Sequence, residues 1–358
     1  MSIGPTSGLS RGIDNAGNRS LTGRRPAFVG FVVLAIAIGA MGWWWSAQAA
    51  ARIHERQGLQ LGTFITLRAT GRAAPAALDA AMQEIDRLEG LFSYSIASSD
   101  VSRLNAAAGQ GRVKLARDTI NVLVAAQRMA ELSQGRFDVT IAPLVDLWGF
   151  RPDGVQAVPT QAQIEAALAL VDFRQLVVDE DAEEAELLLP GMAIDLGAIA
   201  KGYVGDRVTQ VLCEHGVVSA VIDIGGNIYA LGMRSDGSAW RVGLQHPRET
   251  DALLGILPIT DRSVATSGDY QRFFMVGEER FHHLLDPSTG YPTTGMASIS
   301  IVAPTGMEAD AVSTAAFVLG PQAGMALVRA LGLEAVMYTE DGQLELTGGL
   351  QALFEAPN

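Results

Sequence analysis

The chain has a single cysteine and a shortage of basic residues. Cys213 is the only cysteine among 358 residues, so neither an internal disulfide nor a cysteine metal cluster can form. It lies in an apolar stretch with helical spacing, which predicts a small buried side chain. Lys and Arg number 26 against 39 Asp and Glu, which gives a net charge of −13. Such a surface repels a phosphate backbone, so we expect no nucleic-acid partner.

Charged residues are scarce overall, at 18%, whereas hydrophobic residues reach 48%. This composition is typical of a globular chain with a large core and excludes wholesale disorder. The acidic excess has a second consequence. An anionic ligand would need local help from a metal ion, a lysine or main-chain amides.

The first 50 residues have a composition of their own. Residues 1–26 are rich in Gly, Ser, Asn and Arg without periodicity, which predicts a disordered tail. Arg24 and Arg25 then precede an apolar run over 27–45, which at about 19 residues can just span a bilayer. The triplet Ala47-Gln48-Ala49 fits a small-residue cleavage site. We interpret 27–50 as either a signal peptide or a transmembrane anchor, and both interpretations stay open.

Both interpretations place the body of the protein on the same side of the membrane. The positive residues before the apolar run keep the tail in the cytoplasm. We therefore expect the body to be exported across the inner membrane. It would be periplasmic, or anchored to the periplasmic face of the inner membrane. In the second case the uncleaved N-terminal segment would bind the membrane.

Residues 58–358 have the pattern of one folded domain, in which strands and helices do not alternate strictly. This order favours an α+β layered fold with a strand-rich second half over a doubly wound parallel sheet. Helices are expected over 78–92, from an N-cap at Asp118 to Gly135, from a capping box at Thr160 and Gln163, over 198–215 and over 308–319. Strands are expected over 61–69, 175–178, 186–189, 193–195, 217–224, 228–231, 240–244, 273–276, 281–285 and 298–302.

The segment from Asp195 to Tyr203 is the first candidate for chemistry. A strand ends at Asp195, a turn containing Gly197 follows, and a helix begins with Lys201 in its first turn. Amides at a helix N-terminus attract phosphate, and the lysine adds a positive charge. A tight strand-to-helix connection with a solvated lysine explains the same residues equally well.

Two polar residues on an apolar helix form the second candidate. Asp310 and Thr314 are four positions apart, so their oxygens lie on one helical face. A carboxylate with a hydroxyl gives oxygen-only ligation, which suits Mg²⁺. The helix dipole favours acids in a first turn, which explains Glu308 but not Thr314.

The third candidate is a histidine pair that precedes a turn with the sequence Asp286-Pro287-Ser288-Thr289-Gly290. Because side chains alternate along a strand, His282 and His283 point to opposite faces and one of them can face a site. Histidine is the usual general base near neutral pH. A lone strand histidine is more often structural.

The remaining candidates are turn and aromatic residues. Gly225-Gly226-Asn227 suits a hairpin turn that needs positive φ, while Asp223 ends an apolar run and calls for a partner. The aromatic and hydroxyl groups of Phe92-Ser93-Tyr94 suit a flat heterocycle. Trp148 and Phe150 are better interpreted as core.

These segments occur in an order that resembles a known family. The blocks that carry the likeness are Leu61-Gly62-Thr63, Ser102-Arg103-Leu104-Asn105, Phe137-Asp138, Pro143 to Phe150, Asp195 to Tyr203, Gly225-Gly226-Asn227-Ile228, Ala265 to Tyr270, His283 to Gly290 and Glu308-Ala309-Asp310. Together they are similar to the ApbE family of FAD:protein FMN transferases. The resemblance covers roughly Leu61 to the C-terminus.

The resemblance implies a site and a reaction. Mg²⁺ would be held by Asp310, Thr314 and the carbonyl of Ala198, and His283 would be the base. FAD, as substrate, would be bound by Leu61, Phe92, Ser93, Tyr94, Asp138, Lys201, His283 and Leu285. FMN would pass from FAD to a Thr or Ser hydroxyl of an acceptor flavoprotein subunit, with release of AMP. Leu61 stands where a methionine is common in the family.

Two other functions fit parts of the pattern. A module that binds FAD, or only hydrolyses it, would need no acceptor, although Asp310 and Thr314 argue against simple binding. A flavin-carrying assembly factor for a respiratory complex would have a degenerate site, although Lys201 and His283 are present. The appearance of FMN and AMP from FAD and Mg²⁺ separates binding from catalysis.

Overall fold

The computed structural model describes residues 52–151 and 154–357. The expected tail over 1–26 and the expected signal peptide or anchor over 27–50 lie outside these residues. Within them, no helix is both long enough and apolar enough to cross a membrane. The first strand begins at Ile53, ahead of the domain start expected at residue 58.

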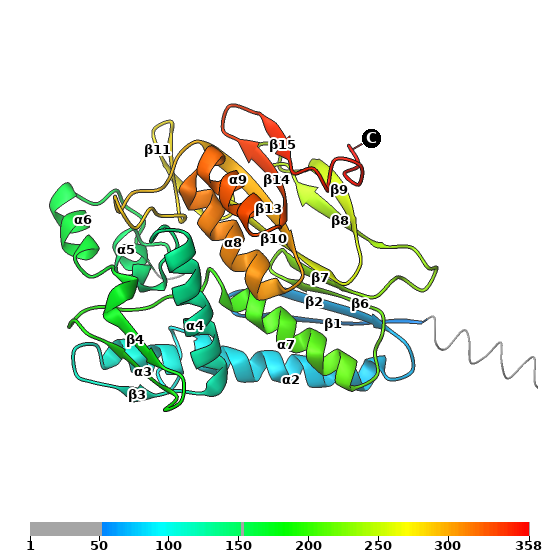
Figure 1. Ribbon diagram of the computed structural model, residues 1–358, viewed down its shortest axis with the longest axis horizontal. Coiled ribbons are helices and arrows are strands. Elements are labelled where there is room, and N and C mark those ends of the chain that lie inside the picture. Colours follow the sequence, from blue (N-terminus) through cyan, green and yellow to red (C-terminus); the bar gives the residue numbers. More distant parts are fainter. Residues whose placement is uncertain (1–51, 152–153, 358) are drawn as a thin grey trace, which may run out of the picture. The chain divides into compact units, whose positions relative to one another are not determined.

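An antiparallel sheet of eight strands forms the centre of the body (Figure 1). Its strand order is β1-β2-β6-β7-β10-β13-β14-β15, and every neighbouring pair is antiparallel. The strands are β1 (Ile53–Gln60), β2 (Thr63–Thr70), β6 (Ala220–Ile224), β7 (Asn227–Leu231), β10 (Arg262–Gly268), β13 (Met296–Ala303), β14 (Glu334–Thr339) and β15 (Leu344–Leu346).

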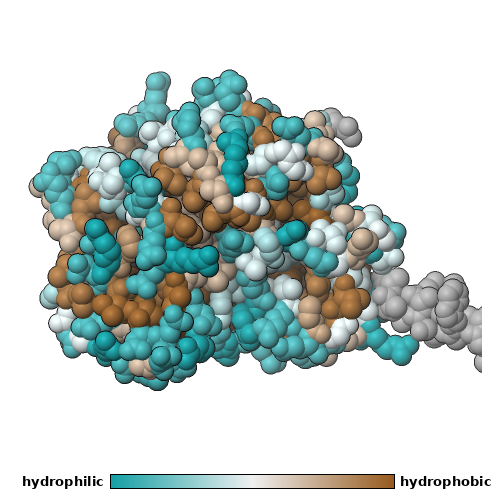
Figure 2. Space-filling view, in the orientation of Figure 1, coloured by the Kyte–Doolittle hydropathy of each residue, from teal (hydrophilic) through white to brown (hydrophobic). Residues whose placement is uncertain are grey.

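Four helices pack on the sheet, namely α2 (Ala74–Phe92), α7 (Ala200–Glu214), α8 (Gly306–Leu319) and α9 (Pro321–Ala330). Helix α2 is amphipathic. It buries Leu78, Ile85 and Leu88, while its polar face lies along the mainly hydrophilic lower margin in Figure 2. Helix α8 is apolar around most of its circumference because it packs against α4 (Arg117–Leu132), α7, α9 and the three strands β7, β10 and β13.

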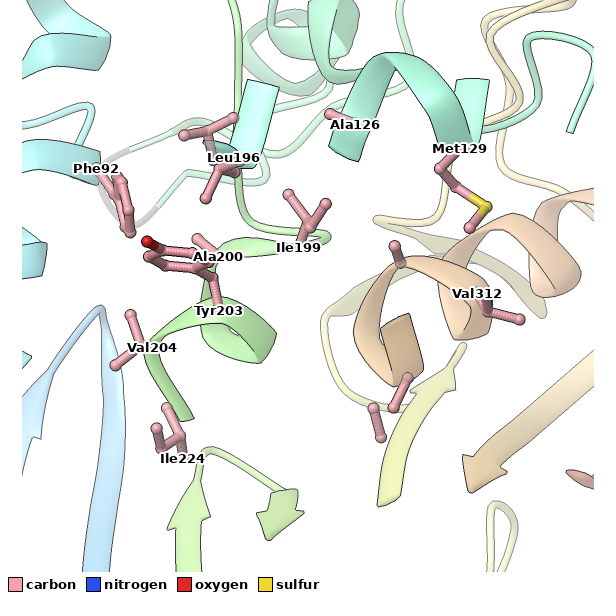
Figure 3. Close-up of a cluster of buried hydrophobic side chains, with 14 of the residues drawn as sticks. Phe92, Ala126, Met129, Leu196, Ile199, Ala200, Tyr203, Val204, Ile224 and Val312 are labelled. Carbon is pink, nitrogen blue, oxygen red and sulfur yellow. The ribbon is translucent and has the colours of Figure 1, made fainter. Parts of the chain in front are cut away.

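The main core lies between these helices and the sheet. Figure 3 shows Phe92 of α2 facing Tyr203 of α7, and the two rings meet edge to face with centroids 5.9 Å apart. Met129 of α4 lies over α8, beside Val312. This packing fixes α7 and α8 relative to each other, and both carry candidate site residues.

A second apolar cluster involves a separate hairpin, β8 (Trp240–Gln245) and β9 (Leu253–Ile259). Val242, Leu244 and Leu257 of the hairpin cluster with Val264 of β10 and Val336 of β14. Strands β7, β10 and β14 thus have apolar side chains in contact with the hairpin as well as with the main core.

Shorter elements complete the body. They are α3 (Asp100–Ala106), β3 (Val113–Lys114), α4 (Arg117–Leu132), η1 (Val139–Ile141), α5 (Ala142–Leu147), α6 (Gln161–Leu168), η2 (Phe173–Gln175), β4 (Leu176–Asp179), β5 (Glu184–Leu187), β11 (Phe273–Val276) and β12 (Glu279–His282). A third cluster stacks Trp148 on Phe281 and includes Phe150. Trp148 and Phe150 are buried, as predicted.

Most predicted elements are present, and the mixed α+β class is confirmed. The capping box of Thr160 and Gln163 is present at the start of α6. The turn at Gly225 and Gly226 has positive φ at both glycines, as expected, and Asp223 accepts a hydrogen bond from the Gly226 N–H.

Several local predictions were wrong. Asp118 is not an N-cap, because α4 begins at Arg117. Residues 193–195 are not a strand, because their main chain bonds to the Asn105 side chain and to the Val139 carbonyl instead of a neighbouring strand. Strand β12 ends at His282, short of residue 285. Cys213 is exposed, because the buried stripe of α7 runs through Val204, Val208 and Leu212.

Candidate active site

One cavity of about 680 Å³ collects most of the candidate residues. It is wide enough for a cofactor-sized ligand. Predicted site residues in its wall are Leu61, Asp138, Ala198, Lys201, His283, Leu285, Asp310 and Thr314. These residues come from segments far apart in the sequence, which the sheet and the α7–α8 pair bring together.

Helix α7 and the turn before it supply one part of the wall. The Asp195 carboxylate accepts a hydrogen bond from the Gly197 N–H at 2.7 Å and pairs with Arg151 at 2.9 Å. The Lys201 ammonium donates to the Gly197 carbonyl at 3.0 Å, so its charge is held over the turn. The predicted turn and first-turn lysine are therefore present at the cavity.

Helix α8 supplies the oxygen pair. Asp310 is 4% exposed, and its Oδ2 accepts a hydrogen bond from the Gly202 N–H at 2.9 Å. Its Oδ1 lies 3.4 Å from the Lys201 ammonium. Thr314 lies one turn further along, with its Oγ1 3.3 Å from the hydroxyl of Ser267. The carboxylate and the hydroxyl share one cavity, as the four-residue spacing predicts.

Tyr229 of β7 holds the first turn of α7 in place through hydrogen bonds. Its buried hydroxyl donates to the carbonyls of Lys201 and Gly202, at 3.0 and 2.8 Å. Burial, with the nearby charges of Asp310 and Asp206, raises the pKa of Tyr229 well above its ordinary value. The phenol is therefore a permanent donor that fixes the backbone beside the lysine.

His283 and His282 have different environments, as predicted, although His283 lies just past the end of β12. His282 is buried, donates from Nε2 to the Thr293 carbonyl at 2.9 Å, and packs edge to face on Phe317. The His283 Nδ1 lies 3.2 Å from the Arg272 carbonyl. Because a carbonyl can only accept, Nδ1 carries the proton and Nε2 is left as the basic nitrogen.

The surroundings of His283 keep its ring neutral. Burial, reinforced by the charge of Arg272, lowers the pKa of His283 to about 3. The side chain is nevertheless partly exposed at the cavity wall. The ring of Phe150 meets it edge to face with centroids 6.5 Å apart, so the aromatic cluster supports the segment after β12 that carries the histidine.

Asp138 lines the cavity and also stabilises the local main chain. Its Oδ1 accepts hydrogen bonds from the Thr140 N–H and hydroxyl, each at 2.7 Å, and its Oδ2 accepts from the Phe173 N–H at 2.8 Å. Burial raises the pKa of Asp138 despite these bonds. It orders the chain between α4 and α5.

Leu61 and Leu285 line the cavity through apolar side chains. Leu61 has a φ of 54°, and its N–H donates to Glu89 at 2.8 Å, which holds the β1–β2 turn against α2. Leu285 is buried in the Trp148 cluster.

Three predicted FAD-binding residues are not among the described residues that line the cavity. Phe92 is buried in the main core, and the Ser93 hydroxyl lies 2.9 Å from that of Ser95. Tyr94 is 40% exposed, with the Arg151 guanidinium 3.9 Å above its ring. Because Arg151 also pairs with Asp195 in the wall, Tyr94 is linked to the cavity through one residue. The role of this segment stays a prediction.

Sequence reasoning missed several residues of the site. Arg136 lines the cavity and pairs with Asp286, which ties the Asp-Pro-Ser-Thr-Gly turn to the end of α4. Ser267 supports Thr314 from β10. Asp206 on α7 binds the first turn of α8. The signal for Asp206 is an acid in the middle of a helix beside the buried residues Val204 and Gly205.

Comparisons with known proteins agree with this fold and cavity. The ApbE family model matches residues 61–337. The FAD:protein FMN transferase of Treponema pallidum is 34% identical over 339 residues, covering 89% of this chain and 92% of that protein. The one from Klebsiella pneumoniae is 34% identical over 299 residues, covering 83% and 92%.

Solved structures agree as well. The ApbE protein of Thermotoga maritima superposes with a TM-score of 0.78 at 30% identity, covering 84% of this chain and 99% of that one. The flavinyl transferase ApbE of Pseudomonas stutzeri gives 0.77 at 30% identity, covering 86% and 98%.

The fold and the cavity define a class of α+β proteins in which the N-terminal parts of two helices meet a histidine that follows a strand at one site. Within that class, the chain belongs to the ApbE family.

Proposed function

We propose that this chain transfers FMN from FAD to a Thr or Ser hydroxyl of an acceptor flavoprotein subunit and releases AMP. The observation that carries the proposal is the grouping of Asp310, Thr314, Lys201 and His283 in one cavity of an ApbE-family chain. Its relatives in Treponema pallidum and Klebsiella pneumoniae are FAD:protein FMN transferases by name.

A magnesium ion fits the donors present. Asp310 and Thr314 offer hard oxygen atoms at the cavity, and Ala198, which has a main-chain carbonyl to offer, lines the same wall. In the described part of the chain, no group of three His, Cys, Asp or Glu residues could hold a metal ion. Mg²⁺ suits such a sparse set because it usually keeps waters and takes phosphate oxygens as ligands. When bound, it would neutralise charge on the pyrophosphate.

The protein's own groups supply the other requirements of transfer. Lys201 places a positive charge beside Asp310, where phosphate charge develops. The acceptor oxygen attacks the FMN phosphorus, the bond from that phosphorus to the bridging oxygen breaks, and AMP leaves. His283 is neutral and takes the proton of the acceptor hydroxyl on Nε2. Water can replace the hydroxyl, which gives slow hydrolysis of FAD.

The N-terminal residues support a proposal about location. Arg24 and Arg25 precede the apolar run over 27–45, so we propose that the body is exported to the periplasm or held at its membrane face. A reporter that is active only in the cytoplasm, fused after Asn358, should be silent. An active reporter would contradict the proposed topology, because it would place the body of the protein in the cytoplasm.

The proposed chemistry is tested by incubating the protein with FAD, Mg²⁺ and exported flavoprotein subunits. We expect AMP in solution and a covalent FMN mass increment on a Thr or Ser of one subunit. Release of FMN and AMP without any adduct would leave an FAD hydrolase. Unchanged FAD would reduce the protein to a flavin-binding module.

A further inference from the structure

Helices α7 and α8 are joined by two hydrogen-bond contacts of the same kind that run in opposite directions. On α8, Asp310 accepts from the N–H of Gly202 on α7 at 2.9 Å. On α7, Asp206 accepts from the N–H of Gly306 on α8 at 2.6 Å. In each helix a glycine is followed four residues later by the aspartate that reaches the other helix.

Asp206 makes a second main-chain contact, whereas the second oxygen of Asp310 faces the Lys201 ammonium. The second oxygen of Asp206 accepts from the N–H of Met307 at 2.9 Å. Gly306 and Met307 are the first two residues of α8, whose amides have no partner within the helix. The N-cap Thr305 side chain reaches only the N–H of Glu308, at 3.3 Å. Asp206 therefore satisfies the amides that the helix's own cap leaves open.

The charge of Asp206 has a cost that offsets part of what these amide bonds contribute. Burial, together with the charges of Asp310 and Glu308, raises the pKa of Asp206 to about 6 although both amide bonds lower it. An ionised carboxylate near like charges opposes folding. The geometry suggests a benefit elsewhere, because the turn that Asp206 holds leads directly to Asp310.

We infer that Asp206 is a positioning residue, which fixes the first turn of α8 so that the carboxylate of Asp310 is held toward the metal site. The inference rests on the magnesium site proposed above. Asp206 touches no ligand itself and acts through Gly306 and Met307. It thus specifies the orientation of a metal ligand from the neighbouring helix.

The test replaces Asp206 by Asn. This change keeps the shape of the side chain, but the oxygen of Asn can accept a hydrogen bond from only one of the two N–H groups. The NH₂ group of Asn is a donor and would face the other N–H. The control is Asp118→Asn on α4, which removes the charge of the carboxylate that accepts a hydrogen bond from the Tyr203 hydroxyl of α7 at 2.6 Å. Should Asp206→Asn fail to fold, Asp206→Ser, which keeps one acceptor oxygen, is measured with the same expectation.

Three quantities are measured on the purified protein without FAD. They are the Mn²⁺ dissociation constant by electron paramagnetic resonance, hydrogen exchange of the segment 304–310, and the melting temperature. A fourth is the Mg²⁺ concentration for half-maximal AMP release from FAD. For Asp206→Asn we expect both metal constants to rise about tenfold, which corresponds to the loss of about one good hydrogen bond to a charged group. Hydrogen exchange of the segment 304–310 should become faster. Activity should largely return at saturating Mg²⁺.

A metal dissociation constant for Asp206→Asn equal to that of the native protein would overturn the inference. So would an equal rise in Asp118→Asn, because the effect would then be general to α7. Failure of the magnesium site itself has a different signature. The native protein and Asp310→Asn would bind Mn²⁺ alike, while exchange at 304–310 would still respond to Asp206→Asn, and the positioning role would fall with the site.

Discussion

A Cβ atom added to Gly202 would lie 2.4 Å from the carbonyl oxygen of Gly306. Helices α7 and α8 therefore approach through two glycines, and this approach allows Asp310 to reach the N–H of Gly202. The site consequently depends on backbone contact between two helices as much as on its polar side chains.

Gly202→Ala is expected to destabilise the protein by about 1–3 kcal/mol, because the new methyl group meets main-chain atoms that cannot turn aside. Activity should fall further than the folded fraction, since Asp310 moves with α8. The matched control is Gly90→Ala in α2, where a Cβ meets nothing within 4 Å. That change should stabilise by roughly 0.5–1 kcal/mol. Chemical denaturation measures the stability of the two variants, and the rate of AMP release measures their activity. Equal stability of the two variants would contradict the close contact.

Asp310→Ala is expected to reduce FMN transfer and AMP release by at least about 100-fold, because electrostatic stabilisation of phosphoryl charge is lost. Added Mg²⁺ should not restore activity. Glu308→Gln serves as the control, since it lies on the same first turns of α8 but is not in the cavity wall. It should keep nearly native turnover. Normal turnover by Asp310→Ala at micromolar Mg²⁺ would remove this residue from the metal ligands.

His283→Ala is expected to lower the transfer rate by about 10²–10⁴-fold while FAD still binds, because a positioned base is lost and the phosphate contacts lie elsewhere. Initial rates and FAD affinity decide this. His282→Ala should keep a near-native rate per folded molecule. It should nevertheless lower the melting temperature, because it deletes a buried ring that packs on Phe317 and bonds to Thr293. A rate loss confined to His282→Ala would reverse the assignment.

The pH dependence follows from the low pKa of His283, about 3. Its ring is neutral through the whole working range, so protonation of His283 should give kcat/KM for FAD no acid-side inflection near the ordinary histidine value of about 6.5. An inflection near that value that disappears in His283→Ala would contradict the assignment.

The same pKa makes a prediction for stability. The unfolded chain binds this proton more strongly than the folded protein does. The contribution of His283 to stability is therefore complete above about pH 6.5 and is lost as the pH falls from there toward 3. Burial lowers the pKa of His282 as well, so its effect has the same sign. Melting temperatures between about pH 5 and 8 measure this loss, which should be smaller in His283→Ala.

The sequence predicts features that depend on local spacing. The four-residue interval between Asp310 and Thr314 places both on one helical face, and strand alternation separates His282 from His283. The turn at Gly225 and Gly226 follows from its composition. Each of these inferences needs only the geometry of a single element. The structure agrees with the outcome of each, although His283 lies just past the end of β12.

Contacts between residues far apart in the sequence could not be predicted from the geometry of single elements. Nothing near Asp206 in the sequence indicates that its partners are the amides of Gly306 and Met307, one hundred residues away. The extended residues before Asp195 resemble a strand locally, yet their hydrogen bonds go to Asn105 and Val139. Cys213 was misplaced because the burial of α7 depends on which face meets the sheet and α2.

The central claim is that this chain moves FMN from FAD onto a protein hydroxyl. The most direct measurement incubates native protein and Asp310→Ala with FAD, Mg²⁺ and the exported proteins of its own host. Denaturing gels viewed by flavin fluorescence, followed by mass spectrometry of the fluorescent band, show the product. We predict a covalent FMN on a Thr or Ser residue, equimolar AMP, and neither with Asp310→Ala. Absence of a fluorescent band with native protein, or an equal band with both proteins, would contradict the account.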